Sequence, residues 1–259
     1  MIPISDENPV LRTPISNWVI LALVFASWIF LQGAGLSHEQ LAISVCNLGM
    51  VPAELTGRAP LGTGVPIGPG MACVVDAESI NVLTPVTSMF LHGGWGHILG
   101  NALFLWVFGN NVEDSMGRIR FVVFYLLCGL AAAGTHVVVE PASPIPTVGA
   151  SGAISGVLGA YLVLYPRVHV KLLVPIVFFI TIVRVRAWVV LLLWFGYQVL
   201  AGLPQLLMVS PEVSGGVAFW AHVGGFVAGL LLVKPFENPS LVRRRATVGD
   251  ARAVWDSRA

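Results

Sequence analysis

Two short segments of the chain contain the residue types of a nucleophile and a base. Ser151 lies in GASG, residues 149–152, and His222 lies in AHVGGFVAG, residues 221–229. A serine hydroxyl is a weak nucleophile until a base takes its proton, and a nearby imidazole can do this near neutral pH. Brought together in space, Ser151 and His222 would support acyl transfer.

A third segment offers groups that could stabilise the oxyanion of such a reaction. His92, His97 and Asn101 follow one another at intervals of five and four residues. Acyl transfer needs hydrogen-bond donors at the developing oxyanion. The Asn101 amide, a ring N–H of His97 and the backbone N–H of Ser151 are donors of this type. We therefore predict an oxyanion hole made by these three residues.

The surroundings of His222 decide how its ring would be oriented. No acidic side chain is expected at the depth of His222 to orient its ring. The predicted catalytic group is therefore a dyad and not a triad.

Each of these features also has a purely structural explanation. A lone buried histidine can be a hydrogen-bonded core residue, and small residues let membrane helices approach closely. The small residues expected at a contact between the fourth and sixth apolar segments are Gly152, Ser155, Gly159, Gly225 and Gly229. Such a contact would also set Ser151 beside His222, so helix packing and catalysis are compatible interpretations.

The composition indicates a membrane protein. Only 10% of the 259 residues are charged, against about 25% in soluble proteins, and 56% are hydrophobic. This composition excludes intrinsic disorder and an ordinary cytosolic enzyme. The net charge of +1 provides no electrostatic field for binding nucleic acid.

Six stretches without Asp, Glu, Lys or Arg are candidates for membrane crossings, since a spanning helix needs about 20 apolar residues. They are 13–38, 79–112, 121–139, 141–166, 187–211 and 213–233. A seventh apolar run, 172–183, is short and contains Pro175, so we expect it at the membrane interface or in a loop. The predicted fold is an all-α bundle of six transmembrane helices.

The positive charges predict the orientation of this bundle. With the amino terminus in the cytoplasm, 13 of the 14 Lys and Arg residues fall on the inner side, and Arg58 is the exception. Positive residues in short loops favour the cytoplasmic side. The predicted division is a cytoplasmic segment 1–12, a membrane domain 13–234 with a long outer loop 33–91, and a cytoplasmic tail 235–259. Both termini would be cytoplasmic and the site would face outward.

The three cysteines are divided between the outer loop and the membrane. Cys46 and Cys73 lie in the outer loop, where the environment would be oxidising. Their spacing leaves open both a disulfide and two free thiols. Cys128 lies within the third apolar segment and is expected to pack there.

The chain resembles the rhomboid intramembrane serine proteases over most of residues 13–234. The resemblance rests on HGGWGHILGN, GNNVEDSMGR, GASG and AHVGGFVAG, in this order along the chain. It implies a six-helix bundle with a water-filled cavity, Ser151 as nucleophile, His222 as base, and His97 and Asn101 at the oxyanion hole. It also implies that His92 lies at the cavity mouth, with Gly149 and Ala150 lining the cavity that receives a substrate, and that Glu113 holds the turn between the second and third helices.

The chain departs from this family at Ser155, where some rhomboids place a tyrosine that stacks on the catalytic histidine. The smaller residue leaves the orientation of His222 to other contacts. Residues 204–216, rich in Gly, Pro and Ser, are expected to form a mobile cap that gates entry.

The sequence therefore predicts an intramembrane serine endopeptidase of a bacterial plasma membrane. Its partners would be single-pass transmembrane substrates and membrane lipid, with no nucleic acid, metal or organic cofactor. The alternative is a non-proteolytic relative that binds membrane proteins for quality control or trafficking. A solute transporter would be expected to show internal repeats, and the sequence contains none that we detect.

Overall fold

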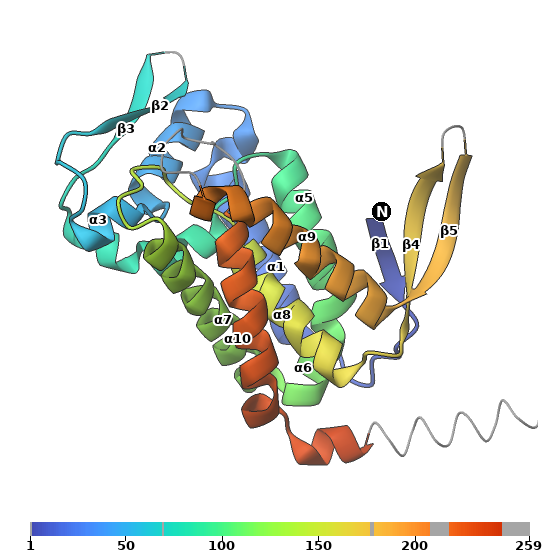
Figure 1. The fold of residues 1–259 in the computed structure, drawn as a ribbon. Helices are drawn as coiled ribbons and strands as arrows, with labels where there is room; N and C mark the ends of the chain where they lie inside the picture. The colour runs from blue at the N-terminus through green and yellow to red at the C-terminus, as the bar shows by residue number, and fades with distance from the viewer. Residues whose placement is uncertain (1, 69, 177–178, 208–217, 245–259) are drawn as a thin grey trace, which may run out of the picture.

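The computed structural model describes residues 2–68, 70–176, 179–207 and 218–244, and it is mostly helical (Figure 1). The helices of the apolar segments are α1 (Ile15–Ala26), α5 (Trp95–Phe104), α6 (Asn110–Met116), α7 (Arg118–Val139), α8 (Ser151–Leu164), α9 (Ala187–Leu207) and α10 (Phe219–Phe236). Short π-helical segments extend α1 through Ser27–Leu31 and join α5 to α6 through Leu105–Gly109.

Three helices of the described part of the chain are long and apolar enough to cross a membrane. They are α7, α10 and the Ala187–Pro204 part of α9. Two further apolar helices, Ile15–Leu31 and Ser151–Leu164, are shorter. The helices occur in the order of the six apolar segments, and the count of six crossings stays a prediction.

Helix α8 lies at the centre of the bundle, where it packs against α7 and α10 and against the α5–α6 segment and α9 (Figure 1). Every residue from Ala153 to Tyr161 is buried. A helix that is apolar on all sides in this way belongs to the interior of a bundle. The start of α8 is therefore held from several sides at once.

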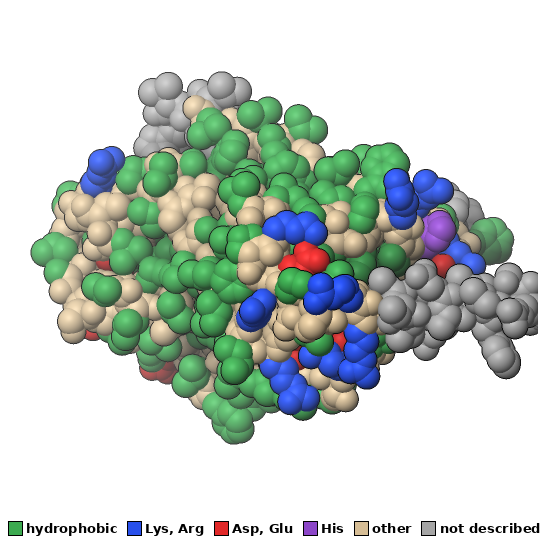
Figure 2. All heavy atoms as spheres, turned by 90° about the horizontal axis from the view of Figure 1, so that it is seen from below, with side chains coloured by type: hydrophobic (Ala, Val, Ile, Leu, Met, Phe, Trp, Pro, Cys, Tyr) green, Lys and Arg blue, Asp and Glu red, His purple; other side chains and the backbone are tan. Residues whose placement is uncertain are grey.

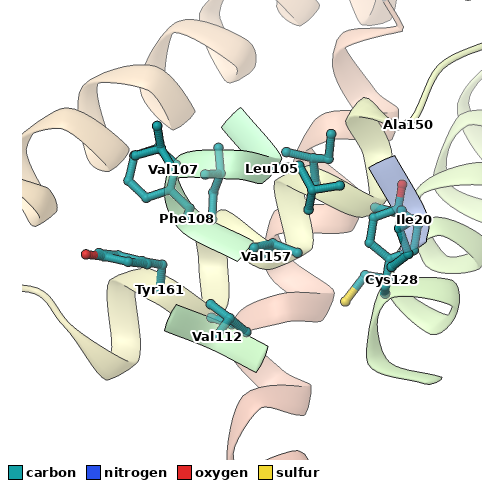
Figure 3. Close-up of a cluster of buried hydrophobic side chains, with 14 of the residues drawn as sticks. Ile20, Leu105, Val107, Phe108, Val112, Cys128, Ala150, Val157 and Tyr161 are labelled. Atoms are coloured by element: carbon teal, nitrogen blue, oxygen red, sulfur yellow. The ribbon is translucent and has the colours of Figure 1, made fainter. Parts of the chain in front are cut away.

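The hydrophobic core fills the space between α8 and its neighbours (Figure 3). Phe108 packs edge-on against Tyr161, with ring centroids 5.0 Å apart. Val157 of α8 and Cys128 of α7 are fully buried in the same cluster. Cys128 thus packs as the sequence analysis expected, and it is a free thiol.

The segment expected as a long outer loop contains short elements at one end of the bundle (Figure 1). They are α2 (His38–Leu48), α3 (Pro52–Thr56), β2 (Gly64–Gly68), β3 (Met71–Val74) and α4 (Thr84–Thr87). A disulfide joins Cys46 of α2 to Cys73 of β3. Of the two alternatives left open by the spacing, the structure has the bonded one.

The prediction of an all-α protein is wrong for two small sheets, the β2–β3 hairpin and a three-stranded antiparallel sheet. The latter has the order β1–β4–β5, from β1 (Ile2–Asp6), β4 (His169–Ile176) and β5 (Phe179–Arg186), and it extends away from the helices (Figure 1). The apolar run 172–183, which was expected at the membrane interface or in a loop, supplies most of β4 and β5. Its many β-branched residues favour a pleated strand, and Pro175 lies near the end of β4, paired with Ile180.

Positive side chains gather on the end of the molecule at which α7 begins and α10 ends (Figure 2). Arg12 at this end forms an ion pair with Asp114 of α6, with Nε 3.0 Å from the carboxylate oxygen. The tail beyond residue 244 and residues 208–216 of the expected cap lie outside the described residues. Pro204, expected to begin that cap, lies inside α9.

Candidate active site

Ser151 and His222 lie side by side although 71 residues separate them in the sequence. Ser151 begins α8, His222 lies in the first turn of α10, and Ser151 Oγ is 2.7 Å from His222 Nε2. The first backbone N–H groups of a helix have no intrahelical acceptor and carry a partial positive charge. The Ser151 hydroxyl therefore has a base on one side and a helix amino terminus beneath it.

Contact between the backbones of α8 and α10 sets this distance. A Cβ atom on Gly225 would lie 2.0 Å from the Gly152 carbonyl oxygen, and one on Gly229 would lie 2.0 Å from the Gly156 carbonyl oxygen. At Gly159, a Cβ would lie 2.3 Å from the Phe226 carbonyl oxygen. Only glycine allows the two helices to approach this closely.

The fifth residue expected at this contact, Ser155, is buried on α8 one turn after Ser151. Its hydroxyl donates a hydrogen bond to the Ser151 carbonyl oxygen at 2.6 Å. The side chain thus bonds its own helix, as serine often does inside helices. It lines the same cavity as Ser151.

Gly149 holds the loop before Ser151 close to His97. Its φ of +134° is a conformation that other residues rarely adopt. A Cβ here would lie 2.8 Å from the His97 ring atoms Cε1 and Nε2 and 3.5 Å from Ser151 Oγ. The absence of a side chain therefore leaves the His97 ring close to the serine. The Gly149 N–H also donates to the Ser88 carbonyl oxygen at 2.9 Å.

Asn101 lies one helical turn after His97 on α5, and its amide is 9% exposed. One amide N–H points to His92 Nε2, with the two nitrogens 2.9 Å apart. An amide has two N–H bonds, so a second donor is left for another acceptor. Asn101 and His97 both line the cavity that contains Ser151.

The structure places His92 and Ala150 away from the described cavity lining, unlike the prediction. His92 is fully buried, and Gln32 binds its backbone twice: the Gln32 amide donates to the His92 carbonyl oxygen, and the His92 N–H donates to Gln32 Oε1. Ala150 packs in the hydrophobic core (Figure 3). Of the three residues expected to line the cavity, Gly149 does so.

Sequence reasoning missed Gln198 of α9, which contacts the second ring nitrogen of His222. Gln198 Oε1 is 2.8 Å from His222 Nδ1, and the side chain is 5% exposed. Trp194, one turn earlier on α9, lies against the same imidazole with ring centroids 5.9 Å apart. Gln198 and Trp194 of α9 thus make contacts to the His222 ring that the small side chain of Ser155 does not make. The sequence did contain a signal for this contact, because Gln198 is an amide side chain in the middle of the apolar segment 187–211.

Glu113 is structural, but it holds a different element from the one expected. Its two carboxylate oxygens accept the backbone N–H groups of Ser16 and Asn17, at 3.1 and 2.8 Å. These groups belong to the first turn of α1, so Glu113 of α6 caps the start of α1. An anion is favourable at this end of a helix.

A cavity of about 630 Å³ surrounds the Ser151–His222 pair. Polar side chains on its wall include His97, Asn101 and Gln198, and apolar lining comes from residues such as Met89 and Ile145. Cavities of this size are typical of binding sites for small ligands or peptide segments. The space can hold both a peptide bond and water.

Comparison with known proteins identifies the family of the chain. The family model described as "Rhomboid domain" matches residues 81–236. "Rhomboid protease GluP" of Bacillus subtilis (strain 168) is 40% identical over 89 residues, which are 34% of this chain and 16% of that protein. "Putative rhomboid protease YdcA" of the same organism is 37% identical over 90 residues, 34% of this chain and 43% of that protein.

A eukaryotic relative aligns over a longer part of the chain. "Presenilin-associated rhomboid-like protein A, mitochondrial" of Danio rerio is 30% identical over 163 residues, covering 60% of this chain and 37% of the relative. The chain thus spans less than half the length of each of these three relatives. Because the rhomboid model matches more than half of the chain, the protein belongs to the rhomboid family of integral membrane proteins.

Proposed function

We propose that the protein is an intramembrane serine endopeptidase that uses Ser151 as nucleophile and His222 as general base. The observation that carries the proposal is the 2.7 Å separation of Ser151 Oγ and His222 Nε2 inside a cavity. The protease names of two bacterial relatives support the same reaction class. No metal or organic cofactor takes part in the proposed mechanism.

In the first half of the reaction, Ser151 Oγ attacks the carbonyl carbon of the scissile peptide bond while its proton passes to His222 Nε2. The tetrahedral intermediate carries a negative oxygen, which the Asn101 amide, the His97 ring and the Ser151 backbone N–H stabilise. Collapse of the intermediate breaks the C–N bond, and His222 gives its proton to the leaving amine. An acyl-enzyme remains on Ser151.

In the second half, water attacks the acyl-enzyme with His222 again acting as base, and Ser151 is regenerated. Water must therefore reach membrane depth. The polar side chains on the cavity wall, His97, Asn101 and Gln198, would hold that water. This requirement is consistent with the presence of these three polar side chains on the wall of an otherwise largely apolar cavity.

The proposed substrates are single-pass transmembrane proteins within the lipid bilayer. A peptide bond inside a helix is shielded by its hydrogen bonds, so helix-weakening residues such as Gly and Pro should favour cleavage. The proposed membrane domain is 13–234 with six crossings, cytoplasmic ends 1–12 and 235–259, and the outer segment 33–91. The positive end in Figure 2 supports a cytoplasmic location for both termini and an outward-facing site, as in a bacterial plasma membrane.

A fluorophosphonate probe that reacts with activated serines tests the proposal. We expect the wild-type protein in detergent to be labelled, and Ser151→Ala and His222→Ala to lose labelling. Ser44→Ala is the matched control, because Ser44 is a buried serine of α2 whose hydroxyl, within the described part of the chain, bonds only the Leu41 carbonyl oxygen. Cleavage of a transmembrane substrate that persists in Ser151→Ala would refute the assignment. Substrate binding without turnover in the wild type would favour the non-proteolytic alternative.

A further inference from the structure

His222 has a polar partner on each of its two ring nitrogens, and the second partner is not explained by a Ser–His dyad. Nε2 contacts Ser151 Oγ at 2.7 Å, and Nδ1 contacts Gln198 Oε1 at 2.8 Å. Both side chains of the second contact are buried, His222 at 8% and Gln198 at 5% exposure. Water competes poorly for a hydrogen bond in such a setting.

The chemistry of this contact selects one tautomer of the imidazole. The amide oxygen of Gln198 can only accept, so Nδ1 must carry the hydrogen. In the neutral ring Nε2 then has the free lone pair, which is the form that can take the Ser151 proton. The opposite tautomer would present an N–H to the serine and could not act as its base.

The surroundings of Gln198 indicate that this contact is specific to one turn of α9. The neighbouring residues Leu193, Tyr197 and Leu200 of α9 are more than 60% exposed and would face lipid. Trp194 and Gln198 lie four residues apart, on one helix face, and both contact His222. An amide in an apolar helix is costly unless it has a partner, and His222 supplies that partner.

We propose that Gln198 is a positioning residue that holds His222 in the tautomer and orientation needed to activate Ser151. The proposal rests on the proposed function for its catalytic consequence, but the tautomer itself is independent of turnover. Because glutamine is neutral, it orients the ring without the charge that an aspartate would add.

Two substitutions of nearly the same size separate hydrogen bonding from packing. Gln198→Met keeps the length of the side chain and removes the acceptor, whereas Gln198→Glu keeps an acceptor and adds a charge. We expect Gln198→Met to lower kcat and the rate of fluorophosphonate labelling about 10- to 100-fold with little change in KM. We expect Gln198→Glu to retain activity, with the acid limb of its pH profile moved to higher pH because a carboxylate stabilises the imidazolium. Tyr197→Phe, at the exposed neighbouring position, is the matched control and should behave as wild type.

The ¹⁵N chemical shifts of the His222 ring provide the readout that does not need activity. We expect the hydrogen on Nδ1 in the wild type and a mixture of tautomers in Gln198→Met, with His222→Ala used to assign the signals. Wild-type shifts and wild-type kcat in Gln198→Met would overturn the proposal. A fixed tautomer in a wild-type protein that no probe labels would leave the positioning role intact and refute the protease assignment instead.

A separate observation concerns charge in the cavity. Glu140 is the only Asp, Glu, Lys or Arg among the described residues that line it, and its carboxylate has no hydrogen-bond or ionic partner in the described chain. It directly follows the carboxyl end of α7, where a negative charge is unfavourable for the helix. Burial also raises the pKa of this carboxyl group. The described chain therefore supplies no structural partner for this half-buried carboxylate on the cavity wall.

We infer that Glu140 forms a subsite for a basic or hydrogen-bond-donating side chain of the substrate, which deepens the proposed function. A transmembrane substrate carrying Arg, Gln or Glu at successive positions around the cleaved bond tests it. At one position Arg should be preferred over Glu by at least about tenfold, as an ion pair worth about 1.4 kcal/mol would give. Glu140→Gln should remove this preference, and Glu140→Lys should reverse it.

The same comparison can be made by photo-crosslinking the substrates to Ser151→Ala, so that binding is measured without cleavage. Glu78→Gln is the control, because Glu78 lies in the outer segment and does not line the cavity. An unchanged preference for charge in Glu140→Gln, in cleavage and in crosslinking, would overturn the subsite. Selective crosslinking without any cleavage by the wild type would support the subsite and count against the protease.

Discussion

Replacing Gly229 by alanine tests the idea that the α8–α10 contact sets the distance between Ser151 and His222, the proposed nucleophile and base. The new Cβ would lie 2.0 Å from the Gly156 carbonyl oxygen. Carbon and oxygen atoms that are not bonded rarely approach closer than about 3 Å, so the two helices would have to separate by about 1 Å at this point. Overpacking of this kind costs about 1–3 kcal/mol, whereas alanine regains at most about 1 kcal/mol of helix propensity.

Activity should suffer more than stability. The clash lies about two helical turns from His222, and a separation of about 1 Å there is a large fraction of the 2.7 Å between Nε2 and Oγ. We expect Gly229→Ala to lower the melting temperature modestly and to slow fluorophosphonate labelling by about 100-fold or more.

Gly196→Ala is the matched control for this experiment. Gly196 is also a helical glycine of the bundle, in α9, but a Cβ there would meet nothing within 4 Å. This variant should be as stable as wild type or slightly more stable, and it should label at the wild-type rate. Equal labelling of Gly229→Ala and wild type would refute the reasoning, because it would mean that the helix contact does not control the site.

Three further predictions follow from contacts described above. Gly149→Ala should abolish labelling while the protein still folds, because the added carbon would displace the His97 ring at the serine; a variant that labels normally would contradict this. Glu113→Gln should lower the free energy of unfolding by about 1–3 kcal/mol, since two charge-assisted hydrogen bonds to α1 are weakened; hydrogen exchange should show α1 opening first. Cys46→Ser should cost about 2–4 kcal/mol by breaking the disulfide to Cys73, and a reductant should lower the melting temperature of the wild type but not of this variant.

The placement of Ser151 beside His222 could be predicted because it depends only on the depth of each residue in the membrane and on which helices touch. The apolar segments set the depth of each residue, and the small residues on two helices indicate which helices touch. The partner on Nδ1 could not be deduced in the same way. Whether Gln198 faces His222 or lipid depends on the rotation of α9 about its axis, which hydrophobicity does not fix in a segment that is apolar all round.

The errors have similar physical causes. The β4–β5 hairpin was missed although its β-branched residues favour a strand, because the short apolar run with Pro175 was compared only with a membrane-spanning helix. Its pairing with β1 also joins segments far apart in the sequence. The position of His92 depends on Gln32, whose side chain binds the backbone of a loop. Contacts of this kind between side chain and loop leave no periodic signal.

The β-sheet also determines how α9 is attached. The helix starts directly after β5, and its first N–H groups, those of Ala187 and Trp188, donate to the carbonyl oxygens of Val168 and Pro166. Ala187 is fully buried. One end of α9 is thus fixed to the segment between α8 and β4, and through β5 to a sheet that includes the amino-terminal strand.

Gln198 lies about 16 Å along the axis of α9 from Ala187, so a tilt of about 10° would move its amide by about 3 Å. That displacement exceeds the 2.8 Å length of its hydrogen bond to His222. Beyond Gln198, the ring N–H of Trp220 in α10 donates a hydrogen bond to the Gly202 carbonyl oxygen of α9 at 2.9 Å, so a tilt of α9 about Ala187 would have to break this bond too. The hydrogen bond that orients the ring of His222, the proposed base, is therefore sensitive to the angle of α9, and a tilt of this helix would release the ring from Gln198.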